Sequence, residues 1–338
     1  MDRSSPPLFP AHKAGLFIVA ILALLLSACS SMNTPVADIP ATETSPTTAP
    51  QEASVENSFS PIEFIDYLDR DVSIDALPQR IVSLAPSVSE TLFAIGAGPL
   101  MVGRTDYCNY PPEVETLPSI GGFAASSISI ETILDLEPDI VIGGSTYQSE
   151  VIDALDTAGI TAFVVQPASL DEIKKTILLL GTITDHANDA QIIIDDMQTR
   201  IDAVTIKVTE IPQEEKPRVF YEVWHEPLMT TTHKTFIGEI IELAGGVNIF
   251  NDLNEQYPSI SAEQIIASDP QVIVGPSNHA DQLTAEIISQ REGWQDISAV
   301  KNESVYILDG DIVSRPAPRI IEALEEMAAI LYPEMINE

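Results

Sequence analysis

The feature that most constrains the fold of this 338-residue chain is an internal repeat. Residues 129–145 (SIETILDLEPDIVIGGS) and 261–277 (SAEQIIASDPQVIVGPS) align without a gap, and six of the 17 positions are identical. Each copy has the pattern of a short helix, a proline that ends it, and an apolar strand. The repeat predicts two similar lobes that contain the same helix–strand unit.

Around both copies, short β-branched runs alternate with amphipathic helical stretches. The runs are RIVSLA, DIVIGG and TAFVVQ in the first half of the chain and RVFYEVW, QVIVGP and SVYILD in the second. This alternation predicts α/β lobes with mostly parallel sheets. Ligands of open α/β sheets lie outside the carboxyl ends of the strands, so we expect a ligand cleft between the two lobes.

One segment between the lobes has a different pattern. Residues 185–210 contain neither Gly nor Pro, and their apolar residues follow helical spacing (Ile193, Met197, Ile201 and Val204). We therefore expect one long bridging α-helix over 185–210, an N-terminal lobe over 61–184 and a C-terminal lobe over 211–338.

The N-terminal region has the pattern of an export signal. Arg3 and Lys13 precede the apolar run AGLFIVAILALLL, and LSAC follows it and ends at Cys29. The run is short for a membrane span, which needs about 20 apolar residues, and LSAC resembles a bacterial lipobox. We expect 1–28 to be a lipoprotein signal peptide, Cys29 to carry lipid, and the Ser/Thr/Pro-rich residues 29–60 to be a disordered tether. An ordinary signal peptide that happens to contain a cysteine is the alternative.

These expectations place the protein on the outer face of the cytoplasmic membrane, anchored by lipid. Loss of residues 1–28 removes Asp2, Arg3 and Lys13, which changes the formal charge from −35 to −36. Such acidity argues against nucleic acid and against anionic membrane surfaces as partners. With Cys29 lipidated, Cys108 has no intrachain disulfide partner. We expect Cys108 to be a small packing residue, and a free thiol is the alternative.

The histidines and the enzyme motifs do not assemble a catalytic centre in the sequence. HEPLM at 225–229 lacks the second histidine of H-E-x-x-H, GAGPLM at 96–101 is not G-x-G-x-x-G, and the chain has no P-loop. His225 is a candidate axial ligand for the metal of a haem or a corrinoid, and a solvated loop histidine is the alternative. We expect neither an enzyme nor a resident cofactor. An exported lipoprotein hydrolase is the alternative from a different class.

Taken in order, several segments resemble the helical-backbone (class III) substrate-binding proteins of ABC importers for cobalamin, ferric siderophores and haem. They run from about Arg80 to about Pro333 and include RIVSLAPSVSETLFAIGAGPLMVG, DYCNYPPE, IETILDLEPDIVIGG, FIGEIIELAGGVNIF, YPSISAEQIIASDPQVIV and RPAPRIIEAL. The resemblance implies two Rossmann-like lobes bridged by one rigid helix. It also implies a monomer that delivers a bulky chelate to an ABC permease dimer with its ATPase subunits.

Two glutamates occupy the same place in the two repeat copies. Glu131 and Glu263 each follow a serine by two residues at an expected helix start. In the resembling family, one glutamate per lobe at this place forms salt bridges with permease arginines, so the resemblance implies that Glu131 and Glu263 dock the permease. The alternative is an acidic side chain that the helix dipole favours in the first turn.

The candidate ligand residues lie in loops of both lobes. Aromatic side chains offer large faces with polar ends, and the resemblance matches several of these positions to the pocket of cobalamin binders. The candidates are Tyr107, Tyr110, Phe123, Trp224, Tyr257, Asp311 and Arg315. Core packing is the alternative for the aromatic residues, and a surface salt bridge is the alternative for Arg315.

The resemblance implies that the transported ligand is cobalamin or a related corrinoid. One departure keeps a ferric siderophore, and in third place haem, open. Where cobalamin binders carry a tryptophan, this chain reads SIGGFAASS, with Phe123 nearby.

Overall fold

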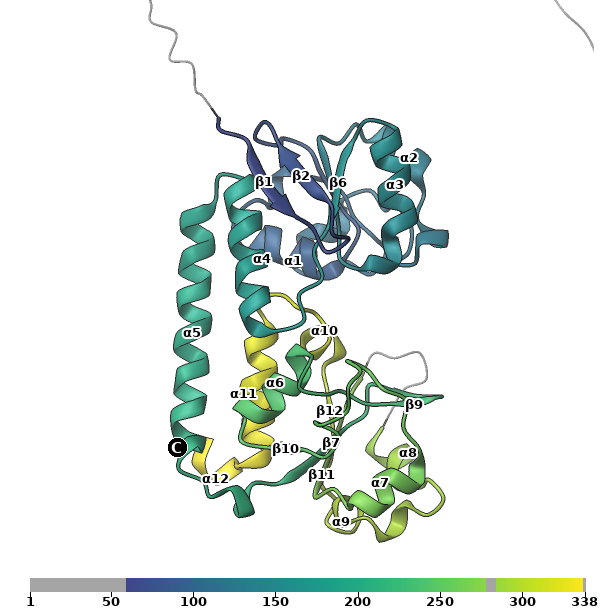
Figure 1. Ribbon diagram of the computed structural model, residues 1–338, viewed down its shortest axis with the longest axis vertical. Coiled ribbons are helices and arrows are strands. Elements are labelled where there is room, and N and C mark those ends of the chain that lie inside the picture. The colour runs from purple at the N-terminus through teal and green to yellow at the C-terminus, as the bar shows by residue number, and fades with distance from the viewer. Residues whose placement is uncertain (1–58, 278–283, 337–338) are drawn as a thin grey trace, which may run out of the picture. The chain divides into compact units, whose positions relative to one another are not determined.

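The computed structural model describes residues 59–277 and 284–336, which belong to one compact unit, Asn57–Glu338 (Figure 1). The predicted signal peptide, the lipidated Cys29 and nearly all of the tether lie outside the described residues. Within the described ranges, no helix combines the length and the apolar character that a membrane crossing requires.

The N-terminal lobe is built on a four-stranded parallel sheet with the order β4-β3-β5-β6. A small antiparallel hairpin, β1 and β2, precedes it. The strands are β1 (Ile62–Ile65), β2 (Asp71–Ile74), β3 (Ile81–Ser83), β4 (Met101–Gly103), β5 (Ile140–Gly143) and β6 (Thr161–Val164). The helices are α1 (Pro86–Ala94), α2 (Ile130–Asp135), α3 (Ser149–Thr157) and α4 (Leu170–Ile183), with short 3₁₀ turns at 98–100, 112–116, 125–127 and 146–148.

The C-terminal lobe repeats this plan with the strand order β10-β7-β11-β12, again all parallel. Its strands are β7 (Arg218–Tyr221), β10 (Val247–Asn248), β11 (Val272–Pro276) and β12 (Val305–Leu308), with a hairpin of β8 (Trp224–His225) and β9 (Leu228–Met229). The helices are α6 (Phe236–Leu243), α7 (Ala262–Ser268), α8 (Ala285–Ser289), α9 (Ser298–Lys301), α10 (Gly310–Val313), α11 (Ile320–Leu331) and α12 (Pro333–Ile336), with 3₁₀ turns at 213–215 and 294–296.

The two repeat copies fold alike, which confirms the prediction of two similar α/β lobes. The copies contain α2 with β5 and α7 with β11, and each of these strands is the third in its lobe's sheet. In both helices a serine caps the N-terminus: Ser129 accepts from the Thr132 N–H and Ser261 from the Gln264 N–H. The shared local chemistry explains why the repeat was visible in the sequence.

The predicted bridging helix is α5 (Ala187–Thr209), 23 residues long, or about 34 Å at 1.5 Å per residue. It packs against α4 of the first lobe and α11 of the second, and Figure 1 shows it running beside both. Met197, Ile201 and Val204 are buried, as their spacing predicted. One hydrophobic core runs continuously from the N-terminal lobe through α4 and α5 into α11.

Candidate functional site

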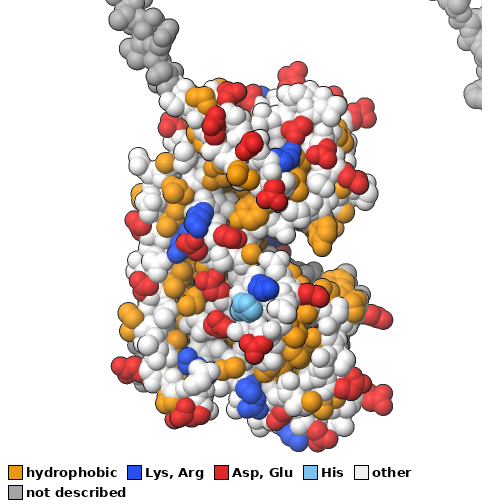
Figure 2. Space-filling model, in the orientation of Figure 1, with side chains coloured by type: hydrophobic (Ala, Val, Ile, Leu, Met, Phe, Trp, Pro, Cys, Tyr) orange, Lys and Arg blue, Asp and Glu red, His pale blue; other side chains and the backbone are white. Residues whose placement is uncertain are grey.

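A cavity of about 590 Å³ lies between the lobes. Its N-terminal wall comes from the loops that follow β3, β4 and β5, and its C-terminal wall comes from the segment after β12, so strand ends of both lobes meet there as predicted. Figure 2 shows the surface hollowed between the two lobes, with apolar side chains on both edges. The lining residues are Ala85, Pro86, Ser87, Tyr107, Phe123, Ala124, Ser127, Gly144, Gly310, Asp311, Ser314, Arg315 and Pro316.

The buried side chain of Gln148 holds the N-terminal wall together. Its Nε2 donates to the backbone oxygens of Leu84 at 2.8 Å and Phe123 at 3.0 Å, and its Oε1 accepts from the Gly144 N–H at 2.9 Å. Three loops therefore converge on one amide. Gly144 lies so close to Ala85 that a Cβ at position 144 would clash with the Ala85 methyl group, which accounts for a glycine at this point of the wall.

The loop that carries Tyr107 and Tyr110 is anchored by Cys108. The Cys108 side chain is 1 % exposed, and its Sγ lies 3.1 Å from the Ser89 Oγ and 3.2 Å from the Thr105 Oγ1. This confirms the prediction of a packing residue. The neighbouring Tyr107 is 60 % exposed and lines the cavity.

The predicted pair Asp311 and Arg315 belongs to the C-terminal wall of the cavity and forms hydrogen bonds with this loop of the N-terminal wall. Arg315 forms an ion pair with Asp311 at 2.7 Å and donates to the Asn109 Oδ1 at 2.8 Å and to the Tyr107 backbone oxygen at 3.3 Å. The Asn109 Nδ2 donates to Asp311 at 2.7 Å. Asn109 belongs to the N-terminal lobe, so these hydrogen bonds join the lobes.

A second, more deeply buried ion pair lies behind the first. Glu90 of α1 is 2 % exposed and accepts two hydrogen bonds from Arg319 of the C-terminal lobe, each at 2.8 Å. Arg315 lies 3.9 Å from the same carboxylate. Burial raises the pKa of Glu90, and the hydrogen bonds and charge of Arg319 oppose that rise. The two carboxylates and the two guanidinium groups of this interlobe seam (Glu90, Asp311, Arg315 and Arg319) cancel in charge.

Tyr110 belongs to this seam rather than to the cavity lining. Its ring lies under the Arg319 guanidinium, with 3.6 Å between the guanidinium carbon and the ring centroid. Of the predicted ligand residues, the structure thus brings Tyr107, Phe123, Asp311 and Arg315 to the cavity. Tyr110 lies outside the lining, and its contact with a ligand stays a prediction.

Trp224, His225 and Tyr257 lie elsewhere on the C-terminal lobe. Trp224 and His225 form β8, their ring centroids are 5.8 Å apart, and the Trp224 Nε1 donates to the Glu226 oxygen. Tyr257 is half-buried, and burial raises its pKa to about 12. None of the three lines the cavity. In the described part of the chain, no three His, Cys, Asp or Glu side chains are grouped to hold a metal ion.

Sequence reasoning missed four residues at or beside the site. Each had a visible but ambiguous signal in the sequence. Glu90 is a glutamate in an apolar helix, and Asn109 lies between two tyrosines. Gln148 is a polar residue after a strand, and Arg319 is the second arginine of RPAPR. Tyr147, next to Gln148 and 84 % exposed, is a further aromatic side chain after β5 that the sequence analysis left out.

The two predicted docking glutamates occupy equivalent exposed positions in the first turns of α2 and α7. Hydrogen bonds from its own backbone N–H and from Ser261 hold the pKa of Glu263 below its usual range. Each lobe therefore presents one exposed carboxyl group at the same place.

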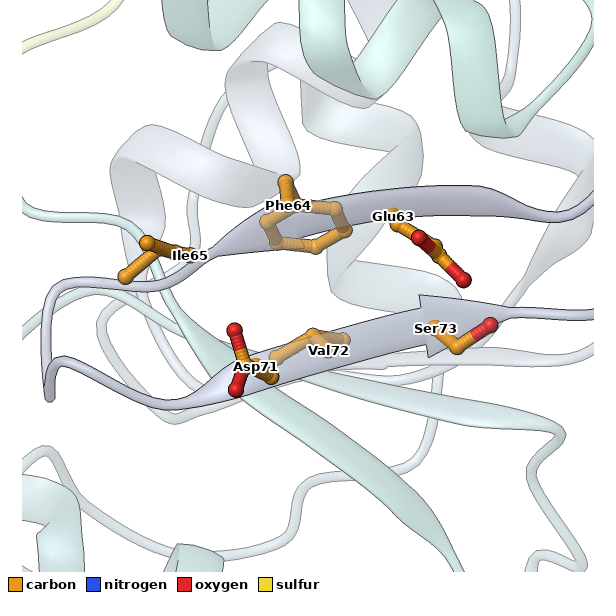
Figure 3. Close-up of a pocket in the computed structure, with 6 residues that line it drawn as sticks. All are labelled: Glu63, Phe64, Ile65, Asp71, Val72 and Ser73. Carbon is orange, nitrogen blue, oxygen red and sulfur yellow. The ribbon is translucent and has the colours of Figure 1, made fainter.

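A second hollow, of about 470 Å³, lies on the hairpin of β1 and β2 (Figure 3). Glu63 and Asp71 are its charged lining residues, and the C-terminal lobe contributes nothing to it. It contains none of the predicted site residues.

Residues 81–312 match the family model described as "Periplasmic binding protein". An uncharacterized ABC transporter substrate-binding lipoprotein of Bacillus subtilis is 32% identical over 292 residues, which cover 85% of this chain and 90% of the relative. A vitamin B12-binding protein of Vibrio cholerae is 31% identical over 258 residues, covering 75% of this chain and 89% of the relative.

Solved structures agree with this relationship. A periplasmic vitamin B12 binding protein of Vibrio cholerae has a TM-score of 0.64 at 31% identity, covering 76% of this chain and 98% of that one. A possible iron-binding (periplasmic solute-binding) protein of Staphylococcus epidermidis has a TM-score of 0.67 at 29% identity, covering 76% and 100%. The family match spans both sheets and the helix between them, and the chain therefore belongs to the periplasmic binding protein family, as a substrate-binding protein of the ABC-transporter type.

Proposed function

We propose that this protein binds cobalamin or a related corrinoid outside the cytoplasm and delivers it to an ABC permease. The observation that carries the proposal is the chemistry of the cavity. Among the residues that the structure describes, its charged lining residues are Asp311 and Arg315, and they neutralise each other at 2.7 Å. Beside them lie aromatic side chains, small residues and hydroxyl groups. A large ring that carries uncharged amides suits such a lining.

The same chemistry disfavours an anionic ligand. An anionic ferric chelate needs uncompensated cations, and here each arginine of the seam already faces a carboxylate. Haem would bring propionates beside Asp311. The relative named for vitamin B12 points in the same direction as the charge balance.

A ferric siderophore is the second candidate. Arg315 lies in the cavity wall, and a structure named for possible iron binding is similar over 76% of this chain. For such a ligand, Asp311 would have to turn away so that Arg315 could pair with the anion.

The remaining parts of the proposal concern attachment and delivery. Cys29 would carry the lipid, residues 29–60 would be the tether, and lobes 61–184 and 211–338 would present Glu131 and Glu263 to the permease as a monomer. Charges at an interface rim act mainly on encounter rate and orientation. Binding would be reversible and non-covalent, with no chemistry performed on the ligand.

Calorimetric titration of residues 57–338, the compact unit, tests the ligand. Cyanocobalamin, a ferric hydroxamate and haemin are titrated in parallel. One-to-one binding of cyanocobalamin alone supports the proposal. Binding of the ferric hydroxamate alone would favour the second candidate function. Absence of cyanocobalamin binding would refute the corrinoid proposal.

A further inference from the structure

The side-chain amide of Asn109 forms a hydrogen bond with each member of the Asp311–Arg315 pair. Its Nδ2 donates to Asp311 at 2.7 Å, and its Oδ1 accepts from Arg315 at 2.8 Å. We infer that Asn109 is a stand-in for a primary amide of the ligand: when the ligand binds, its amide displaces the Asn109 side chain from Asp311 and Arg315. This inference rests on the proposed function and extends it to a residue that controls affinity.

The chemistry of the pair fixes what can replace Asn109. An ionised carboxylate only accepts hydrogen bonds, and a guanidinium only donates them. A group that satisfies both at once needs an N–H donor beside an oxygen acceptor, which a primary carboxamide provides. Hydrogen bonds to charged partners are short and strong, so the pair forms a two-point amide receptor. A carboxylate or a hydroxamate bound to iron lacks the N–H that Asp311 needs.

The surroundings allow the exchange. Asn109 is exposed, and Asp311 is 28 % exposed, whereas Arg315 is held at 11 % by its position in the seam. Cys108 anchors the loop from below, and the Glu90–Arg319 pair joins the lobes without help from Asn109. The asparagine side chain can therefore rotate out while the backbone and the lobes stay in place.

The first test compares Asn109→Ala with the wild-type chain by calorimetric titration of cyanocobalamin. Removing the stand-in removes a competitor, so we expect affinity to rise about tenfold, the change that corresponds to about 1.4 kcal/mol. Asn188→Ala, which alters an exposed asparagine in the first turn of α5, should leave affinity unchanged. Equal or weaker binding by Asn109→Ala would overturn the inference while leaving the corrinoid proposal intact.

The second test needs no ligand and separates the two claims. In the ligand-free protein, the side-chain NH₂ signals of Asn109 in a ¹⁵N NMR spectrum should move in the Asp311→Ala variant, because the acceptor is lost. If the Asn109 signals stay as unchanged between the two proteins as those of Asn188, the stand-in contact is refuted directly. If the wild type does not bind cyanocobalamin but the Asn109 signals move in Asp311→Ala, the proposed function fails while the contact between Asn109 and Asp311 is supported. If cyanocobalamin binds without moving the Asn109 signals, the exchange is refuted.

Discussion

Replacing Arg319 with methionine tests how strongly the buried ion pair joins the lobes. The Glu90 carboxylate is 2 % exposed and accepts two hydrogen bonds of 2.8 Å from Arg319. Methionine keeps an apolar stem and removes the charge, which leaves Glu90 with Arg315 at 3.9 Å. Loss of one partner of a buried pair costs about 3–5 kcal/mol. Because Arg315 still compensates in part, we expect the free energy of unfolding to fall by about 3 kcal/mol.

The pH dependence of this loss gives a second readout. Burial raises the pKa of Glu90 above its usual value in the folded protein, so the folded state binds the proton more tightly than the unfolded state. The contribution of Glu90 to stability therefore falls as pH rises from the usual pKa of glutamate through the raised one. Without Arg319 the pKa rises further and this window extends upward. The deficit of Arg319→Met should thus be smaller at pH 5 than at pH 8.

Urea unfolding at both pH values measures the two effects, and Arg200→Met is the matched control. Arg200 makes the same two-point contact with Glu325, at 2.8 and 2.6 Å, but its side chain is 32 % exposed. Surface pairs contribute about 0.2–1 kcal/mol, so the control should lose little at either pH. Equal losses in the two variants, or an Arg319→Met deficit that is the same at pH 5 and pH 8, would refute the reasoning.

Three further predictions concern the cavity and the docking surface. Gln148→Leu should weaken ligand binding about tenfold and lower stability by about 1–3 kcal/mol, because backbone groups of three wall loops lose their partner; titration and urea unfolding measure these. Tyr107→Ala should weaken cyanocobalamin binding with little change in stability, since the ring is 60 % exposed. Glu131→Arg combined with Glu263→Arg should abolish transport in cells but leave ligand affinity unchanged.

The docking prediction has a control with the same helix position. Glu150 and Glu286 are also exposed first-turn glutamates, one in each lobe, so their double replacement by arginine matches the charge change. Transport lost in both double variants would point to charge alone. Transport retained by the Glu131→Arg and Glu263→Arg double variant would contradict the docking role.

For Gln148→Leu, unchanged affinity would mean that the wall loops keep their place without the amide.

The fold could be predicted from the sequence because its signals are local and repeated. The repeat copies encode the same serine cap, the same short helix and the same buried strand. The absence of Gly and Pro in 185–210 marked α5 because helix propensity accumulates along a long segment. The carboxyl ends of parallel strands fix where the cleft lies, whatever the side chains are.

The site was predicted only in part, because its key contacts join residues far apart in the chain. Asn109 and Arg315 are 206 residues apart, and Glu90 and Arg319 are 229 apart. Periodicity cannot show which charge faces which across a lobe boundary. Tyr110 illustrates the limit: the sequence placed it in an aromatic loop, but could not show that the Arg319 guanidinium of the other lobe lies over its ring.

The arrangement of the seam bears on how far the lobes would have to open for a bulky ligand to enter. The lobes share a continuous core through α4, α5 and α11, and Glu239 of α6 accepts from the Leu170 N–H at the start of α4. Opening the lobes widely would expose this core and break the Glu90–Arg319 pair. Exchange of Asn109 for a ligand amide breaks only exposed hydrogen bonds and replaces them with equivalent ones. The more exposed Asp311–Arg315 pair can therefore exchange Asn109 for a ligand amide, while the buried Glu90–Arg319 pair keeps the distance between the cavity walls.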